Sequence, residues 1–401
     1  MSVPRRLVVV GASLAGLRAV EQARAVGFAG EIVLVGAEVH LPYDRPPLSK
    51  EFLAAGDAPA PHFPRVDELA TGLDVDVRLG APASALDVAD RTVVVGGDTL
   101  DWDALIVATG ATPRSLPGTA HLAGVHVLRT LDDARAVRHA LDAGARTVVI
   151  GGGFIGSEIA AAARARDLPV TVVEALPTPL VRAVGEAAGS ALAGLHARHG
   201  TDLRCGVAVD RLEGIDRVTG VRLIDGTVLP ADLVVVGIGA SPATEWLAGS
   251  GLTLDDGVVC DETLAAAPGV WAAGDVARWA SPDLRRHLRV EHWTTATDMG
   301  VHAATNAVDP DAAAPFRHVP YFWSDWYGRR IQFAGVPVGA PEVVFGSWDA
   351  DAFTALYREG DRLIGVLTLD RRGDVMKYRA QIGQGRSYAD ALEFAAARRS
   401  R

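Results

Sequence analysis

The feature that most constrains the fold is a strand–turn–helix segment between Thr147 and Glu174, which contains the glycine-rich turn GGGFIGSE. Strand-forming residues lead into the turn, and an alanine-rich helical run follows it. Glycines let the backbone turn sharply and approach a pyrophosphate, while the free N–H groups and the dipole of the helix N-terminus favour its negative charge. The segment therefore predicts a Rossmann-like dinucleotide unit whose turn contacts are Gly151, Gly153, Phe154, Ile155 and Gly156.

The acid that closes the next strand indicates which nucleotide binds. Glu174 lies 23 positions after Gly151, where a carboxylate accepts hydrogen bonds from a ribose 2′-hydroxyl. The same carboxylate would repel a 2′-phosphate, and no arginine directly follows it to receive one. We therefore expect NADH rather than NADPH.

A second strand–turn–helix segment stands 140 positions earlier and contains the turn GASLAG. Its predicted cofactor contacts are Gly11, Ser13, Leu14, Ala15 and Gly16. Ser13 replaces the middle glycine, so a pyrophosphate bound there must tolerate a small side chain. At the end of the following strand the expected acid is missing at Ala37, and we expect Glu38 to bind the ribose from one position later.

An internal repeat supports two related nucleotide units. Residues 92–113 align without gaps on residues 221–242, and 7 of the 22 positions are identical. Each copy is typical of a hairpin followed by a buried strand that ends in a glycine turn, at Gly110 in one copy and Gly239 in the other. Two copies of this module, each beside its own glycine turn, predict an α/β protein that binds two nucleotides.

Composition limits the function classes. The chain has 401 residues, enough for two or three domains, and a net charge of −10 that argues against a general affinity for nucleic acid or anionic membranes. Its only cysteines, Cys205 and Cys260, form no CxxC motif. The sequence therefore predicts no metal site or iron–sulfur cluster built from thiols, and no redox-active cysteine pair.

The first residues resemble a secretion signal only superficially. Arg5 and Arg6 precede an apolar run, but Gly11 and Gly16 interrupt that run as a nucleotide turn would. No uncharged apolar run approaches the ~18 residues that a membrane span needs. We therefore expect a cytoplasmic protein with no membrane partner.

The chain has 37 arginines and two lysines, Lys50 and Lys377. Lys50 lies in the segment LPYDRPPLSK, a loop stiffened by prolines. In a chain that uses arginine almost exclusively, a lysine there indicates a role that a guanidinium cannot fill, such as a compact point charge in a tight site. We expect this role for Lys50, and a plain surface position for Lys377.

Motifs beyond the second unit predict the rest of a flavin site. The segment VWAAGD ends in Gly274 and Asp275, whose carboxylate can bond a hydroxyl of the flavin ribitol. The segment EHW at 291–293 begins a predicted helix. The N-terminus of that helix is placed to face the pyrimidine edge of a flavin, where negative charge develops on reduction.

From about residue 316 the composition shifts toward aromatics. Short strands at 343–345, 352–357 and 363–369, with a helix over 389–401, predict a hairpin-rich C-terminal domain. Trp323 and Trp326 fit either the wall of a ring-binding site or a plain core. Residues 316–401 hold 13 Lys+Arg and 10 Asp+Glu, a balance of +3.

Several motifs are specific enough to indicate a family, namely RPPLSK at 45–50, ATGATPR at 108–114, LRTLDDA at 128–134 and PYFWSDWY at 320–327. On these motifs, the chain resembles the FAD-containing, NADH-dependent ferredoxin reductases of the putidaredoxin reductase type. Those enzymes serve Rieske-type oxygenases and bacterial haem-thiolate monooxygenases. The resemblance covers nearly the whole length.

The resemblance implies an α/β fold with two Rossmann-like dinucleotide-binding domains, one inserted in the other, plus a C-terminal α+β domain. The FAD-binding domain would comprise residues 1–113 and 243–315. The NAD-binding domain would comprise residues 114–242, and the C-terminal domain residues 316–401.

The resemblance also implies site residues. It puts Lys50 near the reactive flavin ring, where it stabilises charge on the reduced ring, and Glu158 beside Lys50, where it orients the nicotinamide. A purely structural ion pair is the alternative for these two residues. Further cofactor contacts are expected at Arg45, Ala83, Ala108, Thr109, Arg129, Glu291, His292, Trp293 and Trp323. The chain departs from the family pattern at Ser13, Ala37, Asp298 and Trp326.

These features predict an oxidoreductase that transfers hydride from NADH to FAD and then passes single electrons to an iron–sulfur ferredoxin, which feeds an oxygenase. Acidic ferredoxins would dock near Trp323, helped by the basic balance of the C-terminal domain. We expect a monomer or weak dimer.

Two alternatives remain open. One is an NADH oxidase, rubredoxin reductase or quinone reductase of the same superfamily, although no peroxidatic cysteine stands near Lys50 for four-electron reduction of oxygen. The other is a flavoprotein resembling apoptosis-inducing factor, in which NADH changes the shape and controls partner binding. The net charge of −10 and the compact length do not support that second class.

Overall fold

The computed structural model describes residues 4–54, 56, 60–63 and 66–399. Contacts divide the chain into two compact units, each built from three separate stretches. The first unit comprises Met1–Asp44, His62–Thr112 and Ser241–Pro320, and the second comprises Arg45–Pro61, Pro113–Ala240 and Tyr321–Arg401. The turn GASLAG lies in the first unit and the turn GGGFIGSE in the second.

A six-stranded sheet forms the centre of the first unit, in the order β19-β20-β7-β1-β2-β3. Its strands are β1 (Arg6–Val10), β2 (Glu31–Val35), β3 (Val75–Arg78), β7 (Ala104–Val107), β19 (Ala265–Ala267) and β20 (Val270–Ala272). The pairs are parallel except for β19 with β20 at the edge. Parallel strands are buried on both faces, which explains continuous apolar runs such as LVVV in β1.

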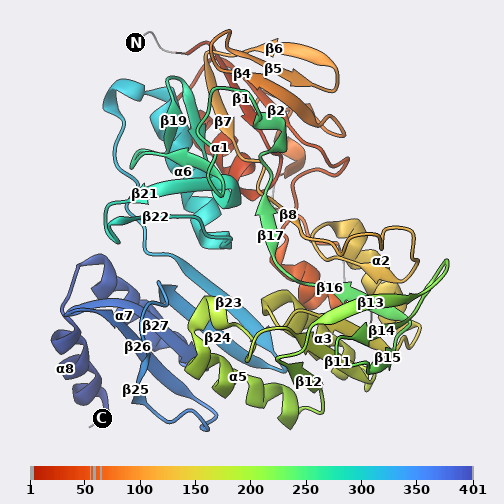
Figure 1. The fold of residues 1–401 in the computed structure, drawn as a ribbon. Helices are drawn as coiled ribbons and strands as arrows, with labels where there is room; N and C mark the ends of the chain where they lie inside the picture. The colour runs from red at the N-terminus through yellow and green to blue at the C-terminus, as the bar shows by residue number, and fades with distance from the viewer. Residues whose placement is uncertain (1–3, 55, 57–59, 64–65, 400–401) are drawn as a thin grey trace. The chain divides into compact units, whose positions relative to one another are not determined.

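Helices α1 (Leu14–Ala25) and α6 (Trp293–Val308) lie side by side against this sheet (Figure 1). A Cβ on Gly300 of α6 would stand 2.3 Å from the carbonyl oxygen of Ala15 in α1, so only glycine allows this approach. Two three-stranded sheets also belong to the unit. One contains β4 (Ala83–Asp87), β5 (Thr92–Val95) and β6 (Asp98–Asp101), and the other β18 (Val258–Cys260), β21 (Ala277–Ser281) and β22 (Arg286–Leu288).

The second unit contains a five-stranded parallel sheet in the order β12-β11-β10-β16-β9. Its strands are β9 (Val125–His126), β10 (Thr147–Ile150), β11 (Val170–Glu174), β12 (Asp202–Cys205) and β16 (Leu233–Val236). The helices of this part are α2 (Leu131–Asp142), α3 (Phe154–Arg164), α4 (Val181–Val184) and α5 (Glu186–Arg198). A three-stranded sheet of β13 (Val209–Gly214), β14 (Val218–Leu223) and β15 (Val228–Pro230) follows the order β13-β14-β15.

The C-terminal stretch of the second unit is an antiparallel sheet in the order β23-β24-β27-β26-β25. Its elements are β23 (Tyr321–Trp326), β24 (Arg329–Gly335), β25 (Glu342–Phe345), β26 (Phe353–Glu359), β27 (Arg362–Leu369), α7 (Arg372–Gly383) and α8 (Tyr388–Arg399). The predicted hairpin strands and terminal helix are therefore present.

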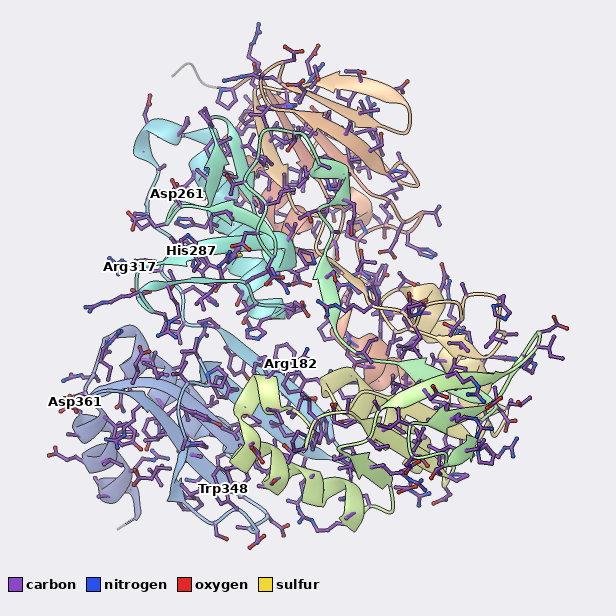
Figure 2. The ribbon with its side chains drawn as sticks, in the orientation of Figure 1. Arg182, Asp261, His287, Arg317, Trp348 and Asp361 are labelled. Carbon is purple, nitrogen blue, oxygen red and sulfur yellow. The ribbon has the colours of Figure 1, made fainter. Side chains whose placement is uncertain are left out.

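The two faces of this C-terminal sheet have different neighbours. Helices α7 and α8 cover one face (Figure 1). The other face packs against the part of the second unit that contains α3 and α4, where the Tyr357 hydroxyl donates to the Val184 carbonyl at 2.6 Å and the rings of Phe322 and Phe154 lie 4.6 Å apart. In the loop between β25 and β26, Trp348 (Figure 2) packs edge-on against Phe353, with ring centres 5.1 Å apart.

The two copies of the internal repeat make matching contacts in their own units. Asp103 and Asp232 stand at identical repeat positions, and their backbone N–H groups donate to the carbonyls of Arg6 and Arg146, respectively. The Asp103 carboxylate accepts the backbone N–H groups of Arg5 and Arg6 at 2.8 and 3.0 Å. The Asp232 carboxylate accepts the backbone N–H of Arg146 at 3.2 Å and its guanidinium at 2.7 and 2.8 Å. Each aspartate therefore anchors the beginning of the central strand, β1 or β10.

The three-domain division predicted from the sequence stays a prediction. The structure groups residues 45–61 with the second glycine turn, and it groups residues 321–401 with the same unit. Among the described residues, no helix combines the length and the apolar character that crossing a bilayer requires.

Candidate functional site

The outer glycines of both turns are required by the protein's own backbone. Gly11 has φ +124°, and a Cβ there would stand 2.1 Å from the Ala108 carbonyl oxygen; in the second turn, Gly151 has φ +107°. A Cβ on Gly16 would lie 1.9 Å from the Gly11 oxygen, and one on Gly156 would lie 2.2 Å from the Gly151 oxygen. These distances exclude a side chain at Gly11, Gly16 and Gly156, and the positive φ disfavours one at Gly151. The four glycines therefore let strand, turn and helix pack closely.

The middle position of each turn is different. A Cβ built on Gly153 would find no neighbouring atom closer than 3.9 Å, and the matching position in the first turn is Ser13. Helices α1 and α3 both begin without a side-chain cap at Ser13 or Gly153. The open space and the uncapped N–H groups fit a pyrophosphate at the beginning of each helix.

Glu174 is held at the end of β11 by the second turn. Its Oε2 accepts the N–H of Gly152 and its Oε1 accepts the N–H of Leu176, both at 2.8 Å. Cys205 is its register partner on β12, and burial followed by the charge of Glu174 raises the pKa of the Cys205 thiol. The carboxylate is therefore fixed beside the turn, and its binding of a ribose stays a prediction.

Glu38 lies in the loop after β2 and is partly exposed. The Tyr43 hydroxyl donates to its Oε2 at 2.5 Å, and its carbonyl oxygen accepts the N–H of Gly80. These bonds fix the acid that follows Ala37. Its role toward a ribose stays a prediction.

The first unit gathers several of the predicted FAD residues at the beginnings of α1 and α6. Gly274 has φ +78°, and a Cβ there would stand 3.1 Å from Cβ of Ala15 in α1 and 3.6 Å from Cβ of Ala296 in α6. The neighbouring Asp275 therefore lies close to both helix N-termini. Trp293, the first residue of α6, donates its indole N–H to the Asp44 carboxylate at 2.7 Å.

Other predicted residues of the first unit have structural partners of their own. His292 precedes α6 and is partly buried, and desolvation followed by the charge of His318 lowers its pKa to about 3. Thr109 donates its hydroxyl to the Ala243 carbonyl at 2.9 Å, and Glu291 pairs with Arg289 at 2.8 Å. The remaining predicted positions of this unit are Leu14 at the beginning of α1, Ala83 at the beginning of β4, Ala108 after β7, and Gly110 with φ +72°.

In the second unit, Lys50 and Glu158 form the ion pair that the resemblance implies. Lys50 Nζ lies 2.8 Å from Glu158 Oε2, and the side chains are 14% and 3% exposed. Glu158 stands in the first turn and a half of α3, directly after Gly156 and Ser157. The pair therefore lies next to the second glycine turn.

Three further contacts to Glu158 are not evident from the sequence. The hydroxyls of Ser49 and Ser324 both donate to its carboxylate. The N–H of Asp325 donates to Oε1 at 3.3 Å, and the Asp325 carboxylate holds Arg330 through two bonds of 2.7 and 2.6 Å. Glu158 thus joins three stretches of the second unit, and Ser49 and Ser324 stand inside the motifs RPPLSK and FWSD.

The two candidate tryptophans have different environments. Trp326 is fully buried and donates its indole N–H to Ser324 Oγ at 2.8 Å. Trp323 is partly exposed and stacks on Tyr321, with ring centres 6.1 Å apart. Trp326 therefore belongs to the core, and Trp323 is the one that a ligand or partner can reach.

The other predicted contacts of the second unit lie around its turn and loops. Arg45 donates to the Arg129 carbonyl at 2.6 Å, which brings these two predicted FAD residues together. Ile155 is 43% exposed at the beginning of α3, next to Phe154. Gly239 has φ +101° and accepts the N–H of Arg114 on its carbonyl oxygen.

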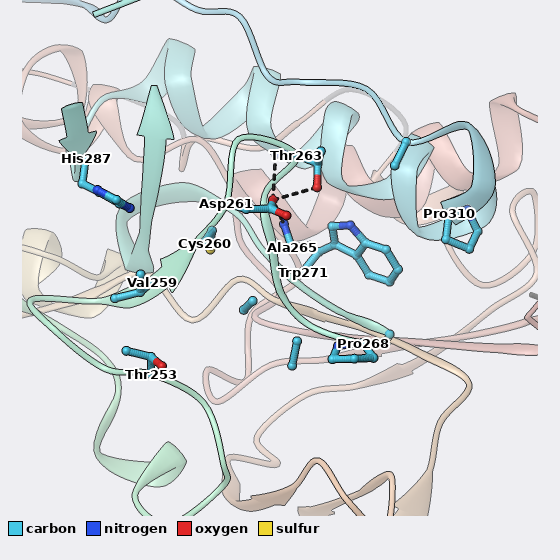
Figure 3. Close-up of a pocket in the computed structure, with 14 residues that line it drawn as sticks. Thr253, Val259, Cys260, Asp261, Thr263, Ala265, Pro268, Trp271, His287 and Pro310 are labelled. Carbon is cyan, nitrogen blue, oxygen red and sulfur yellow. Dashed lines mark hydrogen bonds between the residues drawn. The ribbon is translucent and has the colours of Figure 1, made fainter. Parts of the chain in front are cut away.

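A hollow of about 620 Å³ in the first unit lies away from these residues (Figure 3). It is lined by Thr253, Val259, Cys260, Asp261, Thr263, Ala265, Ala266, Ala267, Pro268, Gly269, Trp271, His287, Pro310 and Ala313. The Asp261 carboxylate already accepts the hydroxyl and N–H of Thr263 and the N–H of Ala265, so it caps a turn. Burial raises the pKa of the Cys260 thiol to about 12, so this thiol stays protonated.

Much of the basic charge near the C-terminus is neutralised locally. Arg317, which projects from the first unit in Figure 2, pairs with Asp283 at 2.7 Å. Asp374, which is 4% exposed, accepts guanidinium groups from both Arg371 and Arg398. Two exposed cations of α7, Arg372 and Lys377, have no salt-bridge partner within the described part of the chain.

Comparison with known proteins identifies the family. Residues 5–300 match the family described as pyridine nucleotide-disulphide oxidoreductase, and residues 321–398 match the reductase C-terminal family. The chain is 36% identical to rhodocoxin reductase of Rhodococcus erythropolis, over 93% of this chain and 88% of that protein. It is 35% identical to the ferredoxin–NAD(+) reductase component of the p-cumate 2,3-dioxygenase system of Pseudomonas putida, over 97% of this chain and 96% of that one.

A solved structure gives the same result for the fold. The covalent putidaredoxin reductase–putidaredoxin complex contains a chain that is 31% identical and matches with a TM-score of 0.91, over 98% of both chains. The predicted α/β fold with a C-terminal domain and the predicted oxidoreductase class are confirmed. FAD and NAD(H), the two predicted cofactors, are those of this family. The chain therefore belongs to the pyridine nucleotide-disulphide oxidoreductase family.

Proposed function

We propose that this chain is an NADH-dependent ferredoxin reductase, which passes electrons from NADH through FAD, one at a time, to an iron–sulfur ferredoxin. The ferredoxin would feed a haem-thiolate monooxygenase or a Rieske oxygenase. The observation that carries the proposal is the shielded Lys50–Glu158 pair beside the second glycine turn, in a chain whose relatives include a ferredoxin–NAD(+) reductase component. Both cysteines are free thiols, so a dithiol step has no place in the proposal.

The chain's own residues would bind and orient the reactants. The flavin, when bound, supplies hydride acceptance and single-electron transfer. The N-terminus of α3 and the space at Gly153 would hold the NADH pyrophosphate, and Glu174 would accept the ribose hydroxyls. The protein's chief contribution to such a transfer is to position the two reactants, since a small misplacement of them lowers the reaction rate strongly.

Lys50 and Glu158 would act beside the transfer. Lys50 supplies a fixed positive charge that stabilises negative charge on the reduced ring. Glu158 holds Lys50 in place and orients the nicotinamide amide. The ion pair is also compatible with a structural role alone, and only variants of both residues separate the two roles.

We propose the cofactor residues of the sequence analysis as the FAD and NAD contacts. For FAD they are Gly11, Ser13, Leu14, Ala15, Gly16, Glu38, Arg45, Lys50, Ala83, Ala108, Thr109, Gly110, Arg129, Gly274, Asp275, Glu291, His292, Trp293 and Trp323. For NAD they are Gly151, Gly153, Phe154, Ile155, Gly156, Glu158, Glu174 and Gly239. The matching division is an FAD domain of 1–113 and 243–315, an NAD domain of 114–242 and a C-terminal domain of 316–401.

The ferredoxin would dock near Trp323, with the exposed cations of α7 as part of the attraction. Ferredoxins are usually acidic, so the attraction would weaken as salt screens the charges. A cytoplasmic location and a monomeric or weakly dimeric state complete the proposal.

Anaerobic stopped-flow absorbance tests this function. The yellow protein is mixed with NADH, and then with a panel of small ferredoxins and cytochrome c. Rapid bleaching, followed by cytochrome reduction that needs an added ferredoxin, is the expected result. Rapid bleaching with reoxidation that only oxygen, a quinone or rubredoxin accelerates would replace the proposal with an oxidase, quinone reductase or rubredoxin reductase.

A further inference from the structure

A buried network of hydrogen bonds lies in the second unit close to Glu158. His196 Nε2 lies 3.2 Å from Ser157 Oγ, and His196 Nδ1 lies 2.8 Å from the Tyr327 hydroxyl. The Tyr327 hydroxyl in turn lies 2.8 Å from Thr201 Oγ1. This hydrogen-bond network joins α3, α5 and the loop before β12 to the tip of the β23–β24 hairpin.

The titratable groups of this hydrogen-bond network, His196 and Tyr327, are neutral at ordinary pH. His196 is 0% exposed, and burial followed by the charge of His199 lowers its pKa to about 4. Burial also raises the pKa of Tyr327 to about 12. The neutral imidazole therefore donates through one ring nitrogen and accepts through the other, while each hydroxyl can do both, so these residues make directional hydrogen bonds without charge.

Tyr327 occupies a backbone position that favours glycine. It has φ +53°, and Gly328 after it has φ +78°, so the two form the tight turn of the hairpin. A bulky aromatic residue is disfavoured in the left-handed region. Its ring stacks on His199, with centres 4.5 Å apart and planes 7° from parallel. The presence of a tyrosine at this position is therefore explained by the contacts of its side chain and not by the conformational preference of the turn.

The same hairpin holds Glu158, the neighbour of Ser157, from its other side. Ser324 and the N–H of Asp325 bond the Glu158 carboxylate, while Tyr327 reaches Ser157 through His196. Trp326 contacts both sets of residues: its indole N–H donates to Ser324, and the centre of its ring lies 5.1 Å from the centre of the His196 ring. Two adjacent residues of α3 are thus tied to one hairpin by two separate routes.

We propose that Ser157, His196 and Tyr327 are positioning residues for hydride transfer, because they fix the β23–β24 hairpin on α3 and so hold Glu158 against Lys50. The inference rests on the proposed function for the reaction in which Glu158 acts. None of the three residues needs to touch a cofactor, since their effect passes through Glu158.

The test variant is Tyr327→Phe, which keeps the ring and removes only the hydroxyl. Its matched control is Tyr357→Phe, because the Tyr357 hydroxyl also bonds across the same two parts of the unit, at Val184, but takes no part in the bonds that connect Tyr327 to Ser157 through His196. The rate of flavin reduction by NADH should fall on the order of tenfold in Tyr327→Phe, with little change in NADH affinity. The rate in Tyr357→Phe should stay at the wild-type value.

Two further measurements separate positioning from general loosening. In a Glu158→Gln background, Tyr327→Phe should cause almost no further loss of rate, because the two changes act through one group. Amide exchange in residues 321–335 should be faster in Tyr327→Phe than in Tyr357→Phe. Additive losses of rate, or equal rates in the two tyrosine variants, would overturn the inference. If the wild-type flavin is not reduced by NADH at all, the proposed function fails instead.

Discussion

Lys50 Nζ and Glu158 Oε2 lie 2.8 Å apart, although 108 residues separate them in the chain. The same carboxylate accepts bonds from Ser49, Ser324 and Asp325, so its negative charge is balanced by one cation and three neutral donors. A shielded ion pair of this kind stabilises the fold only while both partners are present, since removing one leaves a buried charge unpaired.

Removing Lys50 should therefore cost stability as well as activity. We expect Lys50→Met to lower the free energy of unfolding by about 3 kcal/mol, as measured by urea denaturation. The double variant Lys50→Met/Glu158→Gln should regain part of that loss, because no unpaired charge remains. If the pair also acts in the reaction, flavin reduction by NADH stays slow in the double variant. A double variant no more stable than Lys50→Met would contradict this account of the pair.

The glycines of the second turn should separate folding from binding. Gly153→Ala should leave the melting temperature unchanged, because the nearest atom to its Cβ would be the Gly237 carbonyl oxygen at 3.9 Å. NADH binding should weaken on the order of tenfold, because the methyl group enters the pyrophosphate space. Gly156→Ala should destabilise the second unit, since its Cβ would stand 2.2 Å from the Gly151 oxygen. Thermal melting and NADH titration check both variants. Unchanged NADH affinity in Gly153→Ala would remove this turn from the binding site.

Glu174 should set the preference between the two nicotinamide cofactors. The double variant Glu174→Ala/Ala175→Arg removes the repelling carboxylate and adds a partner for a 2′-phosphate, so the ratio of kcat/KM for NADPH to that for NADH should rise. Glu174→Gln is the control that loses the charge without adding a cation. Its ratio should shift less. If the ratio of the two kcat/KM values stays constant in the double variant, the assignment of Glu174 to the ribose is contradicted.

Two histidines with lowered pKa values, the buried His196 and the partly buried His292, should make the protein less stable in acid. The pKa values of His196 and His292 are lowered to about 4 and about 3 by burial, against about 6.5 in an unfolded chain. Each therefore binds a proton more readily when unfolded, so stability is full above about pH 6.5 and falls as pH drops toward 4. The slope approaches about 1.4 kcal/mol per pH unit for each histidine. Urea denaturation of His196→Gln between pH 7 and 4.5 should show a shallower decline than the wild type.

The sequence predicted the parts of the fold that local pattern determines. The two glycine turns, the hairpins of the repeat and three strands of the C-terminal sheet, β25, β26 and β27, follow from residue periodicity and turn chemistry, whereas β23 and β24 were not predicted as strands. Matching contacts at Asp103 and Asp232 bear out the repeat. The Lys50–Glu158 contact was expected only through the family resemblance, because no spacing rule joins a loop to a helix so far along the chain.

Contacts between distant segments account for what the sequence did not predict. His196 looks like an ordinary residue of a helix in the sequence, and only the contact of Trp326 and Tyr327, at the tip of the β23–β24 hairpin, with α5 brings Tyr327 to it. Ser49 and Ser324 stood inside recognised motifs without an assigned role. Strand alternation in FWSDW offered one usable signal, since it puts Ser324 and Trp326 on one face of β23 and Trp323 on the other. That alternation distinguishes the buried tryptophan from the accessible one.

The interleaving of the two units has a consequence for protein synthesis. The sheet of the first unit begins with β1 at Arg6, yet its strand β20 and its covering helix α6 are not available until Val308 has been made. The parallel sheet of the second unit is complete once Val236 has been made. Chains fold as their segments emerge. The unit that the ribosome begins first is therefore finished only after the five-stranded parallel sheet of the other unit is complete.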